Sequence, residues 1–204
     1  MIVVDVETTG LDPKKNSIVS IGAVDFYSPT NQFYQECRVW EGAEVTAEAL
    51  QVNGFTEEQV RDPRKSSLEE VITAYSKWLE MFIDITSGGE NPSFDRDFLL
   101  DSGKRYNINL GIGHRSVDLH TLCYTHQRQR GLNPPLNKRR TDLNTDKILQ
   151  YVGLPAEPKP HHALMGAKME AEAFSRFIYG RPLLKEFANH PVPDYLHSNI
   201  LARS

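Results

Sequence analysis

The N-terminal residues Met1-Ile-Val-Val-Asp-Val-Glu-Thr-Thr-Gly-Leu-Asp-Pro13 form an apolar run that two carboxylates interrupt. The run predicts a buried β-strand. Asp5 and Glu7 are two positions apart, so strand alternation points both side chains to one face. Two unpaired anions there would be costly. A hard divalent cation such as Mg²⁺, which takes oxygen ligands, is the simplest explanation; the alternative is an edge strand with one face in solvent.

The composition indicates one globular domain. The chain has 204 residues, of which 39% are hydrophobic, enough for one sizeable core. A net charge of −4 is untypical of a protein that coats nucleic acid, so a polyanion would be held locally. Cys37 and Cys123 lack the spacing of a zinc site. We therefore expect a reduced, cytoplasmic protein without a leader or a membrane-spanning segment.

The first part of the chain predicts strands followed by helices. Ser17–Phe26 and Gln32–Trp40 read as antiparallel strands that follow the first strand. A short helix is expected over residues 43–50, and Asn53-Gly54 breaks it. Ser67-Leu-Glu-Glu70 is a capping box that begins a clear helix. The apolar face of this helix is expected to dock on the sheet.

The second part predicts a further strand and four further helices. The expected elements are a loop over residues 87–93, an amphipathic helix from about Asp95, a strand over residues 112–117, and helices over residues 120–126, 146–153 and 162–179. Residues 181–204 are expected to form a C-terminal tail with one short helix near residues 194–201.

The segment Gln127–Arg140 concentrates basic side chains in an acidic protein. It contains Arg128, Arg130, Lys138, Arg139 and Arg140. Glycine and two prolines predict a loop. Two interpretations stay open: a solvated loop, or a surface that follows a phosphate backbone.

Three motifs resemble those of the DEDD exonucleases of the ribonuclease H-like fold. The first is Asp5-Val-Glu-Thr-Thr-Gly-Leu-Asp-Pro13, and the second is Gly89-Glu-Asn-Pro-Ser-Phe-Asp95. The third is His161-His-Ala-Leu-Met-Gly-Ala167, in which the alanines make His161 rather than His162 the family histidine. The sequence thus resembles the histidine, or DnaQ-like, subtype, which includes proofreading subunits of bacterial DNA polymerases.

The resemblance implies a fold and an activity. The implied fold is α/β: a ribonuclease H-like mixed five-stranded sheet, its first three strands antiparallel, flanked by helices. The exonuclease domain would cover residues 1–180. The implied activity is metal-dependent 3′–5′ hydrolysis of single-stranded 3′ ends, releasing nucleoside 5′-monophosphates with two Mg²⁺ or Mn²⁺ ions. Asp5, Glu7 and Asp95 would hold the metals, and His161 would be the general base, since imidazole accepts protons near neutral pH.

The resemblance also implies a binding site for the 3′-terminal nucleotide. The turn after Glu7 would offer hydrogen bonds to the terminal sugar and phosphate, and aromatic or aliphatic side chains would stack on bases. Asn53 stands where the family has a histidine in Val52-Asn-Gly-Phe-Thr56, and an amide can still donate and accept. The candidate substrate-binding residues are Thr8, Thr9, Gly10, Leu11, Asn53, Asn91 and Phe94.

Gly166 departs from the family pattern, because the fourth carboxylate belongs at this position. Glycine in a helix costs about 1 kcal/mol relative to alanine. The open explanations are a close backbone approach that needs glycine, a natural or introduced loss of function, and replacement by Glu170 one turn along. We expect slow cleavage; the alternative is a pseudo-exonuclease that binds 3′ ends or docks on a polymerase.

The partners implied are single-stranded DNA or RNA 3′ ends, with a DNA polymerase or a second copy of the chain as a protein partner, and no membrane. Discrimination against RNA depends on contacts to the 2′-hydroxyl of the terminal sugar. Nothing in this sequence predicts that choice.

Overall fold

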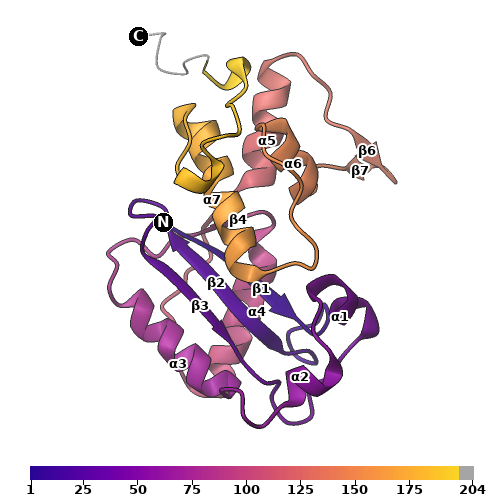
Figure 1. Cartoon of the computed structure of the whole chain (residues 1–204), viewed down its shortest axis with the longest axis vertical. Coiled ribbons are helices and arrows are strands. Elements are labelled where there is room, and N and C mark those ends of the chain that lie inside the picture. Colours follow the sequence, from indigo (N-terminus) through magenta and orange to yellow (C-terminus); the bar gives the residue numbers. More distant parts are fainter. Residues whose placement is uncertain (198–204) are drawn as a thin grey trace.

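A five-stranded sheet with the strand order β3-β2-β1-β4-β5 forms the centre of the molecule (Figure 1). The computed structural model describes residues 1–197. β1 and β2 pair antiparallel, as do β2 and β3, whereas β4 and β5 continue the sheet in parallel. The strands are β1 (Ile2–Thr8), β2 (Ile18–Asp25), β3 (Gln32–Glu36), β4 (Ser87–Gly89) and β5 (Ser116–Asp118). The expected ribonuclease H-like sheet is confirmed, and the edge-strand alternative for β1 is wrong because β1 is central.

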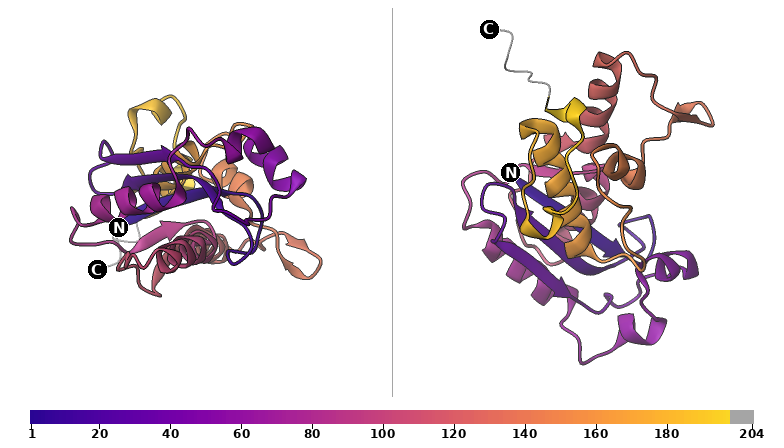
Figure 2. Two further views of the ribbon diagram at one scale, coloured as in Figure 1. Left: turned by 90° about the horizontal axis from the view of Figure 1, so that it is seen from below. Right: turned by 45° about the horizontal axis from the view of Figure 1, so that its top comes forward.

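Helices cover both faces of this sheet (Figures 1 and 2). They are α1 (Ala47–Asn53), α2 (Glu57–Arg61), α3 (Leu68–Leu79), α4 (Pro92–Arg105), α5 (Leu119–Gln129), α6 (Thr145–Tyr151) and α7 (Ala163–Tyr179). Two single 3₁₀ turns, η1 (Lys185–Phe187) and η2 (Asp194–Leu196), follow α7. The predicted capping box of α3 is confirmed: Glu70 N–H donates to Ser67 Oγ, and Ser67 N–H donates to the Glu70 carboxylate.

Strand alternation in β1 decides which face carries the carboxylates. Ile2, Val4 and Val6 are buried in the core that α3 and α4 cover. Val3 is buried on the opposite face, in the core that contains α7. Asp5 and Glu7 have the same parity as Val3, so they face α7.

Helix α7 lies close to β2 because the contact point is a glycine. A Cβ atom at Gly22 would overlap the backbone of Ala163 and Leu164, in the first turn of α7. This approach, which only glycine permits, brings the beginning of α7 against the face of β1 that carries Asp5.

The prediction of a loop over residues 87–93 is wrong. It contains β4, of sequence Ser-Gly-Gly, and the first residues of α4, which begins at Pro92 rather than near Asp95. No β-branched residue marks β4 as a strand; its parallel pairing with β1, Ile2 to Ser87 and Val3 to Gly88, defines it. Asn91 precedes α4 in the left-handed conformation, with φ of 51°.

Several other boundaries differ from the sequence prediction. β3 ends at Glu36, the short helix expected over residues 43–50 is α1, and the expected strand over residues 112–117 is β5. α2 was not predicted, although Thr56 and Gln59 form a capping box at its start. Residues 136–141 form a small hairpin, β6 (Leu136–Asn137) and β7 (Arg140–Thr141), in the expected loop.

The C-terminal segment packs on the rest of the molecule. Leu184, Phe187 and Leu196 are buried in the same core as α7. The short helix expected near residues 194–201 is reduced to η2, and its last positions lie outside the described residues. Within residues 1–197, no helix has the length and apolar character needed to cross a membrane.

Candidate active site

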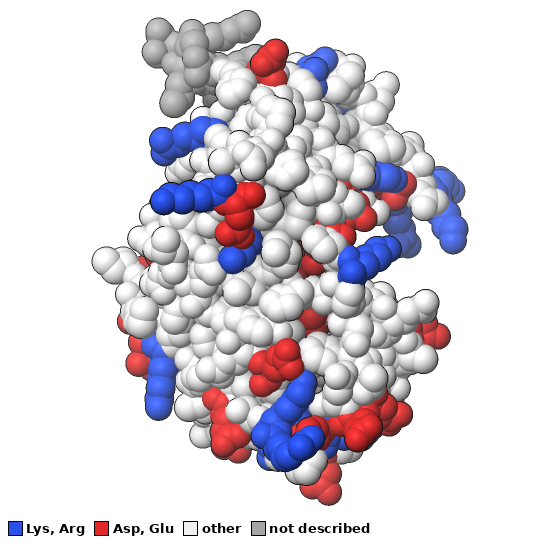
Figure 3. Space-filling view, viewed as in Figure 1, with Lys and Arg blue, Asp and Glu red and all other residues white. Residues whose placement is uncertain are grey.

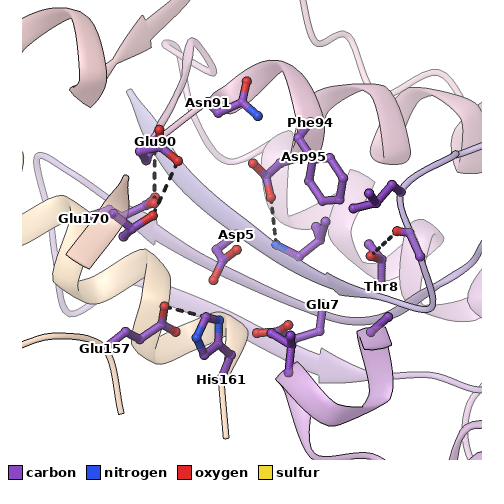
Figure 4. Close-up of a pocket in the computed structure, with 16 residues that line it drawn as sticks. Asp5, Glu7, Thr8, Glu90, Asn91, Phe94, Asp95, Glu157, His161 and Glu170 are labelled. Atoms are coloured by element: carbon purple, nitrogen blue, oxygen red, sulfur yellow. Dashed lines mark hydrogen bonds and ion pairs between the residues drawn. The ribbon is translucent and has the colours of Figure 1, made fainter. Parts of the chain in front are cut away.

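A cavity of about 280 Å³ lies where β1, α1, α4 and α7 meet (Figure 4). Six of its lining side chains are carboxylates, and within the described part of the chain no lysine or arginine joins them. Its lining is Asp5, Val6, Glu7, Thr8, Gly10, Leu11, Ala49, Val52, Glu90, Asn91, Phe94, Asp95, Thr145, Glu157, His161 and Glu170. The four residues predicted to be catalytic, Asp5, Glu7, Asp95 and His161, are all among them.

Strand β1 and helix α4 supply three of these carboxylates. Asp5 and Glu7 project from β1 toward α7, and Glu7 is buried. Asp95 is buried in the first turn of α4, where Val6 N–H donates to Asp95 Oδ1 at 3.0 Å. A backbone hydrogen bond from the strand therefore fixes the α4 carboxylate beside the strand carboxylates.

His161 enters the cavity from the segment before α7. Its Nδ1 lies 3.6 Å from Glu157 Oε2, and its backbone N–H donates to the Val52 carbonyl at 3.0 Å. His162 lies outside the cavity lining and stacks on Tyr34, with ring centroids 4.4 Å apart. Of the two adjacent histidines, His161 is thus the one beside the carboxylates.

The carboxylates of the cavity are electrostatically uncompensated. Burial raises the pKa of Asp5 well above its usual range, and the nearby Asp95, Glu7, Glu170 and Glu157 raise it further. Burial and the charges of Glu157 and Asp95 raise the pKa of Glu7 to about 7. Burial is also the main cause that raises the pKa of Asp95 to about 7. Burial and like charges both favour the protonated acids, and within the described lining no lysine or arginine offsets them.

The side chains fit a hard divalent cation. Mg²⁺ and Mn²⁺ prefer oxygen ligands, and carboxylate oxygens dominate this lining. Ligand atoms of Glu7, Glu157 and His161 lie within 4.8 Å of one another. Glu157 Oε1 is buried without a hydrogen-bond partner among the described residues. A buried acceptor without a donor is rare, and a cation would satisfy it.

Most of the predicted substrate-binding residues also line the cavity. Thr8, Gly10 and Leu11 come from the turn after β1, and Asn91 and Phe94 come from the beginning of α4. Leu11 is 84% exposed, and Phe94 is half-buried against Phe98, with ring centroids 4.9 Å apart. An exposed aliphatic group and an aromatic ring at the rim suit contact with a base.

Thr9 and Asn53, which the sequence predicts to contact the substrate, do not line the cavity. The Thr9 hydroxyl donates to the Glu44 carbonyl and accepts from Ser17 N–H. Asn53 is buried, and its side-chain amide donates to the Thr8 carbonyl at 3.0 Å. Both side chains use their polar atoms to hold the turn after β1.

Gly166 lies directly against Asp5. A Cβ atom at this position would overlap Asp5 Oδ2 and would lie 3.3 Å from Glu157 Oε1. Because the overlap is with the end of a side chain, a rotation of Asp5 could relieve it. Glu170, the other candidate on α7, is buried, and it accepts a hydrogen bond from Glu90 N–H at 3.1 Å. Burial and Asp95 raise the pKa of Glu170 well above its usual range.

Sequence reasoning missed three polar residues of the lining. Glu90 and Thr145 approach each other across the cavity, with Thr145 Oγ1 donating to Glu90 Oε2 at 3.4 Å. Glu157 is the third, in the segment between α6 and α7. Glu157 is four residues before His161 in a proline-rich loop, and no periodic pattern relates the two. The nearest available signal was an acidic residue close to a candidate catalytic histidine.

The basic segment is partly engaged in internal contacts. Arg130 lies over the Tyr195 ring at 3.9 Å and donates to the Tyr151 hydroxyl. The hairpin residues Lys138, Arg139 and Arg140 are exposed. Figure 3 shows basic side chains at the hairpin and acidic atoms set back in a hollow on the same face. Thr145, which follows the hairpin in the sequence, lines the cavity.

The sequence matches the RNase T family, described as exonuclease, over residues 2–174. This chain belongs to that exonuclease family. It is 29% identical over 178 residues to the PolC-type DNA polymerase III of Thermotoga petrophila, and the match covers 87% of this chain but 12% of the polymerase. The PolC-type enzyme of Thermotoga maritima matches equally, at 29% identity over 178 residues, 87% of this chain and 12% of that enzyme.

Solved structures of exonucleases share the fold. Exonuclease I from Methylocaldum szegediense superposes with a TM-score of 0.68 at 16% identity, over 88% of this chain and 41% of that one. The structure of E. coli Exonuclease I in complex with a dT13 oligonucleotide superposes with a TM-score of 0.65 at 15% identity. The match covers 86% of this chain and 40% of that one. The chain thus spans less than half the length of these relatives, and the likeness at this identity concerns the fold.

Proposed function

We propose that this chain is a metal-dependent 3′–5′ exonuclease that removes nucleoside 5′-monophosphates from single-stranded 3′ ends. The observation that carries the proposal is the convergence of Asp5, Glu7, Asp95 and His161 in one cavity. These residues come from β1, from α4 and from the segment before α7. Membership of the exonuclease family, shown by the match over residues 2–174, supports the same activity.

The carboxylates would hold Mg²⁺ or Mn²⁺. Asp5 and Glu7 on β1, together with Asp95 on α4, are the residues that would bind the cations. When bound, such ions polarise the phosphoryl oxygens, lower the pKa of a bound water and stabilise the departing oxygen. The raised pKa of Asp5, Glu7 and Asp95 without a cation is consistent with this use.

His161 would accept the proton of the attacking water. As the water oxygen bonds to phosphorus, the bond from phosphorus to the 3′-oxygen of the preceding nucleotide breaks, and that oxygen takes up a proton. Glu157 Oε2, 3.6 Å from His161 Nδ1, would orient the ring and stabilise it once protonated.

The rim of the cavity would hold the terminal nucleotide. Leu11 and Phe94 would contact the bases, and stacking of this kind tolerates any base. Thr8, Gly10 and Asn91 would face the sugar and phosphate, while the exposed hairpin residues 138–140 would attract the upstream strand. We expect little sequence preference.

A second candidate function is binding of 3′ ends without turnover, as a DNA polymerase-associated module. The observation in its favour is Gly166, which leaves α7 without the carboxylate that the family motif has there. The similarity to two PolC-type polymerases supports a polymerase partner in proofreading or DNA repair. A second copy of this chain is the other partner we predict, and sedimentation of the chain alone would reveal it.

The test uses 5′-labelled single-stranded DNA and RNA of the same sequence, with Mg²⁺, with Mn²⁺ or with EDTA. Exonuclease action gives a ladder of products that keep the 5′ label, and only when a cation is present. Fluorescence anisotropy on the same oligonucleotides measures binding separately. A matched oligonucleotide with a blocked 3′ end controls for cleavage within the strand.

The outcomes separate the two candidates. A cation-dependent ladder from the unblocked strand supports the exonuclease. Binding without shortening supports the binding module. Products from the blocked strand as well would contradict both, because they would reveal an endonuclease.

A further inference from the structure

One oxygen of the Glu157 carboxylate has a position that neither the motifs nor its proposed contact with His161 explains. The Glu157 side chain is 7% exposed, yet Oε1 has no hydrogen-bond partner among the described residues. The other oxygen, Oε2, faces His161 Nδ1. Figure 4 shows the carboxylate pointing into the cavity beside Asp5, Glu7 and His161. A buried acceptor normally finds a donor, so the free oxygen indicates a missing positive group.

The free oxygen lies at the place that a side chain on residue 166 would occupy. The Cβ position built on Gly166 is 3.3 Å from Glu157 Oε1 and overlaps Asp5 Oδ2. Asp5 and Glu157 therefore face each other across the space that glycine leaves. The Glu157 carboxylate, from the loop before α7, thus lies beside the helix position at which the family motif has its fourth carboxylate.

Two backbone contacts hold the loop in this position. Glu157 N–H donates to Asp146 Oδ1 in the first turn of α6 at 3.0 Å. At the other end, His161 N–H donates to the Val52 carbonyl at the end of α1. The carboxylate is thus supported by α6 and α1, and is not merely an exposed acid near the site.

Glu170 is a weaker candidate for the same place. Its Oε1 already accepts from Glu90 N–H at 3.1 Å, and Oε2 lies against Gly89. Figure 4 shows Glu170 turned toward Glu90 and away from Glu7. Its hydrogen bond holds it at the β4–α4 end of the cavity.

We propose that Glu157 replaces the carboxylate missing at position 166, as a metal ligand beside Asp5 and Glu7. This inference rests on the proposed metal-dependent activity. Opposite oxygen ligands of one Mg²⁺ lie about 4.2 Å apart, since each is about 2.1 Å from the ion. Ligand atoms of Glu7 and Glu157 lie within 4.8 Å, so small side-chain rotations would bring them to a shared ion. An active site is then complete without a carboxylate on the first turn of α7.

The test measures Mn²⁺ binding to the whole metal-free chain by calorimetry and by electron paramagnetic resonance. Glu157→Gln keeps the shape and removes the charge, and it should raise the Mn²⁺ dissociation constant at least about tenfold. Adding Gly166→Asp to that variant should recover much of the binding. Gly166→Asp alone should add little, because two carboxylates would then compete for one position. Glu80→Gln, an exposed acid at the end of α3, is the matched control.

Thermal unfolding separates a ligand from a structural residue. Without metal, Glu157→Gln should melt at a temperature equal to or above that of the wild type, because a buried like charge has been removed. The rise in melting temperature that Mn²⁺ produces in the wild type should shrink in the variant. If Glu157→Gln loses stability without metal, or binds Mn²⁺ like the wild type, Glu157 is not a metal ligand. The proposed function is unaffected by that result. Failure of the wild type to bind Mn²⁺ and to cleave overturns the proposed function as well.

Discussion

Helix α7 touches two groups of buried charges that are built in opposite ways. Toward its C-terminal end, Glu172 and Arg176 form an ion pair at 2.8 Å, and both side chains are fully buried. At its N-terminal end, α7 faces the carboxylates of the cavity, which have His161 beside them but no lysine or arginine within the described lining. The same helix thus carries a buried ion pair, here called the closed pair, and forms one wall of the acidic cavity, here called the open site.

Both side chains of the closed pair make further hydrogen bonds to the backbone. Arg176 donates to Glu172 and to the backbone carbonyls of residues 152, 187, 190 and 191. The other Glu172 oxygen accepts from the N–H groups of Leu183 and Leu184. These contacts hold the C-terminal segment on α7. The buried charge that supports the fold thus comes with its partner, whereas the buried acids of the cavity have no lysine or arginine beside them within the described lining.

The strongest test of this comparison is Asp5→Asn. Loss of this carboxylate should reduce cleavage at least about a thousandfold, since metal-assisted charge stabilisation contributes several kcal/mol. Single-turnover rates on a labelled oligonucleotide would measure the loss. Asp12→Asn, in the exposed turn after β1, is the control. Near-normal cleavage by Asp5→Asn would show that the carboxylates of the cavity do not take part in the reaction.

Breaking the closed pair should affect stability. Arg176→Met leaves Glu172 buried without its partner and should lower the free energy of unfolding by about 3 to 5 kcal/mol, measured by urea denaturation. Arg181→Met, which changes an exposed arginine nearby, is the matched control. Pairing Arg176→Met with Glu172→Gln should recover part of the loss. If Arg176→Met is as stable as the control, the pair does not support the fold.

The dependence of stability on pH should reveal the open site. The pKa of Glu7 rises from 4.5 to about 7 on folding, and that of Asp95 from 3.8 to about 7. Between these values the folded chain binds more protons than the unfolded chain, so stability falls as the pH rises. In EDTA we expect each of the two groups to contribute a loss on the order of 2 kcal/mol between pH 5 and pH 8. Saturating Mg²⁺ should reduce this loss, and a loss that is identical with Mg²⁺ would contradict a metal site.

The smallest expected effect concerns the rim of the open site. Phe94→Ala should weaken oligonucleotide binding about tenfold, because stacking on one base contributes about 1 to 3 kcal/mol. The KM should rise while kcat changes little. Tyr27→Ala removes an exposed ring elsewhere and should leave both constants unchanged. A change in kcat alone for Phe94→Ala would indicate a packing role against Phe98 instead.

The sequence predicted the fold where local signals agreed with the final structure. The apolar run of β1, the capping box at Ser67 and the long pattern of α7 each identify an element. β4 was missed because Ser87-Gly-Gly89 has no strand propensity, and only its pairing with β1 makes it a strand. α2 has only five residues, too few for a periodic pattern, and the capping box of Thr56 and Gln59 is the local signal at its start.

The candidate site divides in the same way. The motifs predict Asp5, Glu7, Asp95 and His161 as catalytic residues, and these four residues all line one cavity. Thr9 and Asn53 lie in the matching motifs too, yet they bond to the backbone outside it. A motif records which residues occur together along the chain, and side-chain direction depends on the turn that they build.

By itself, the sequence determined the alternation that puts Asp5 and Glu7 on one face of β1, and the absence of a carboxylate at residue 166. Only the tertiary structure decided what faces them. The close approach of α7 at Gly22 brings Gly166 against Asp5, and the loop anchored on α6 and α1 brings Glu157 to the same place. Residues so far apart in the chain meet through packing, which no local spacing encodes.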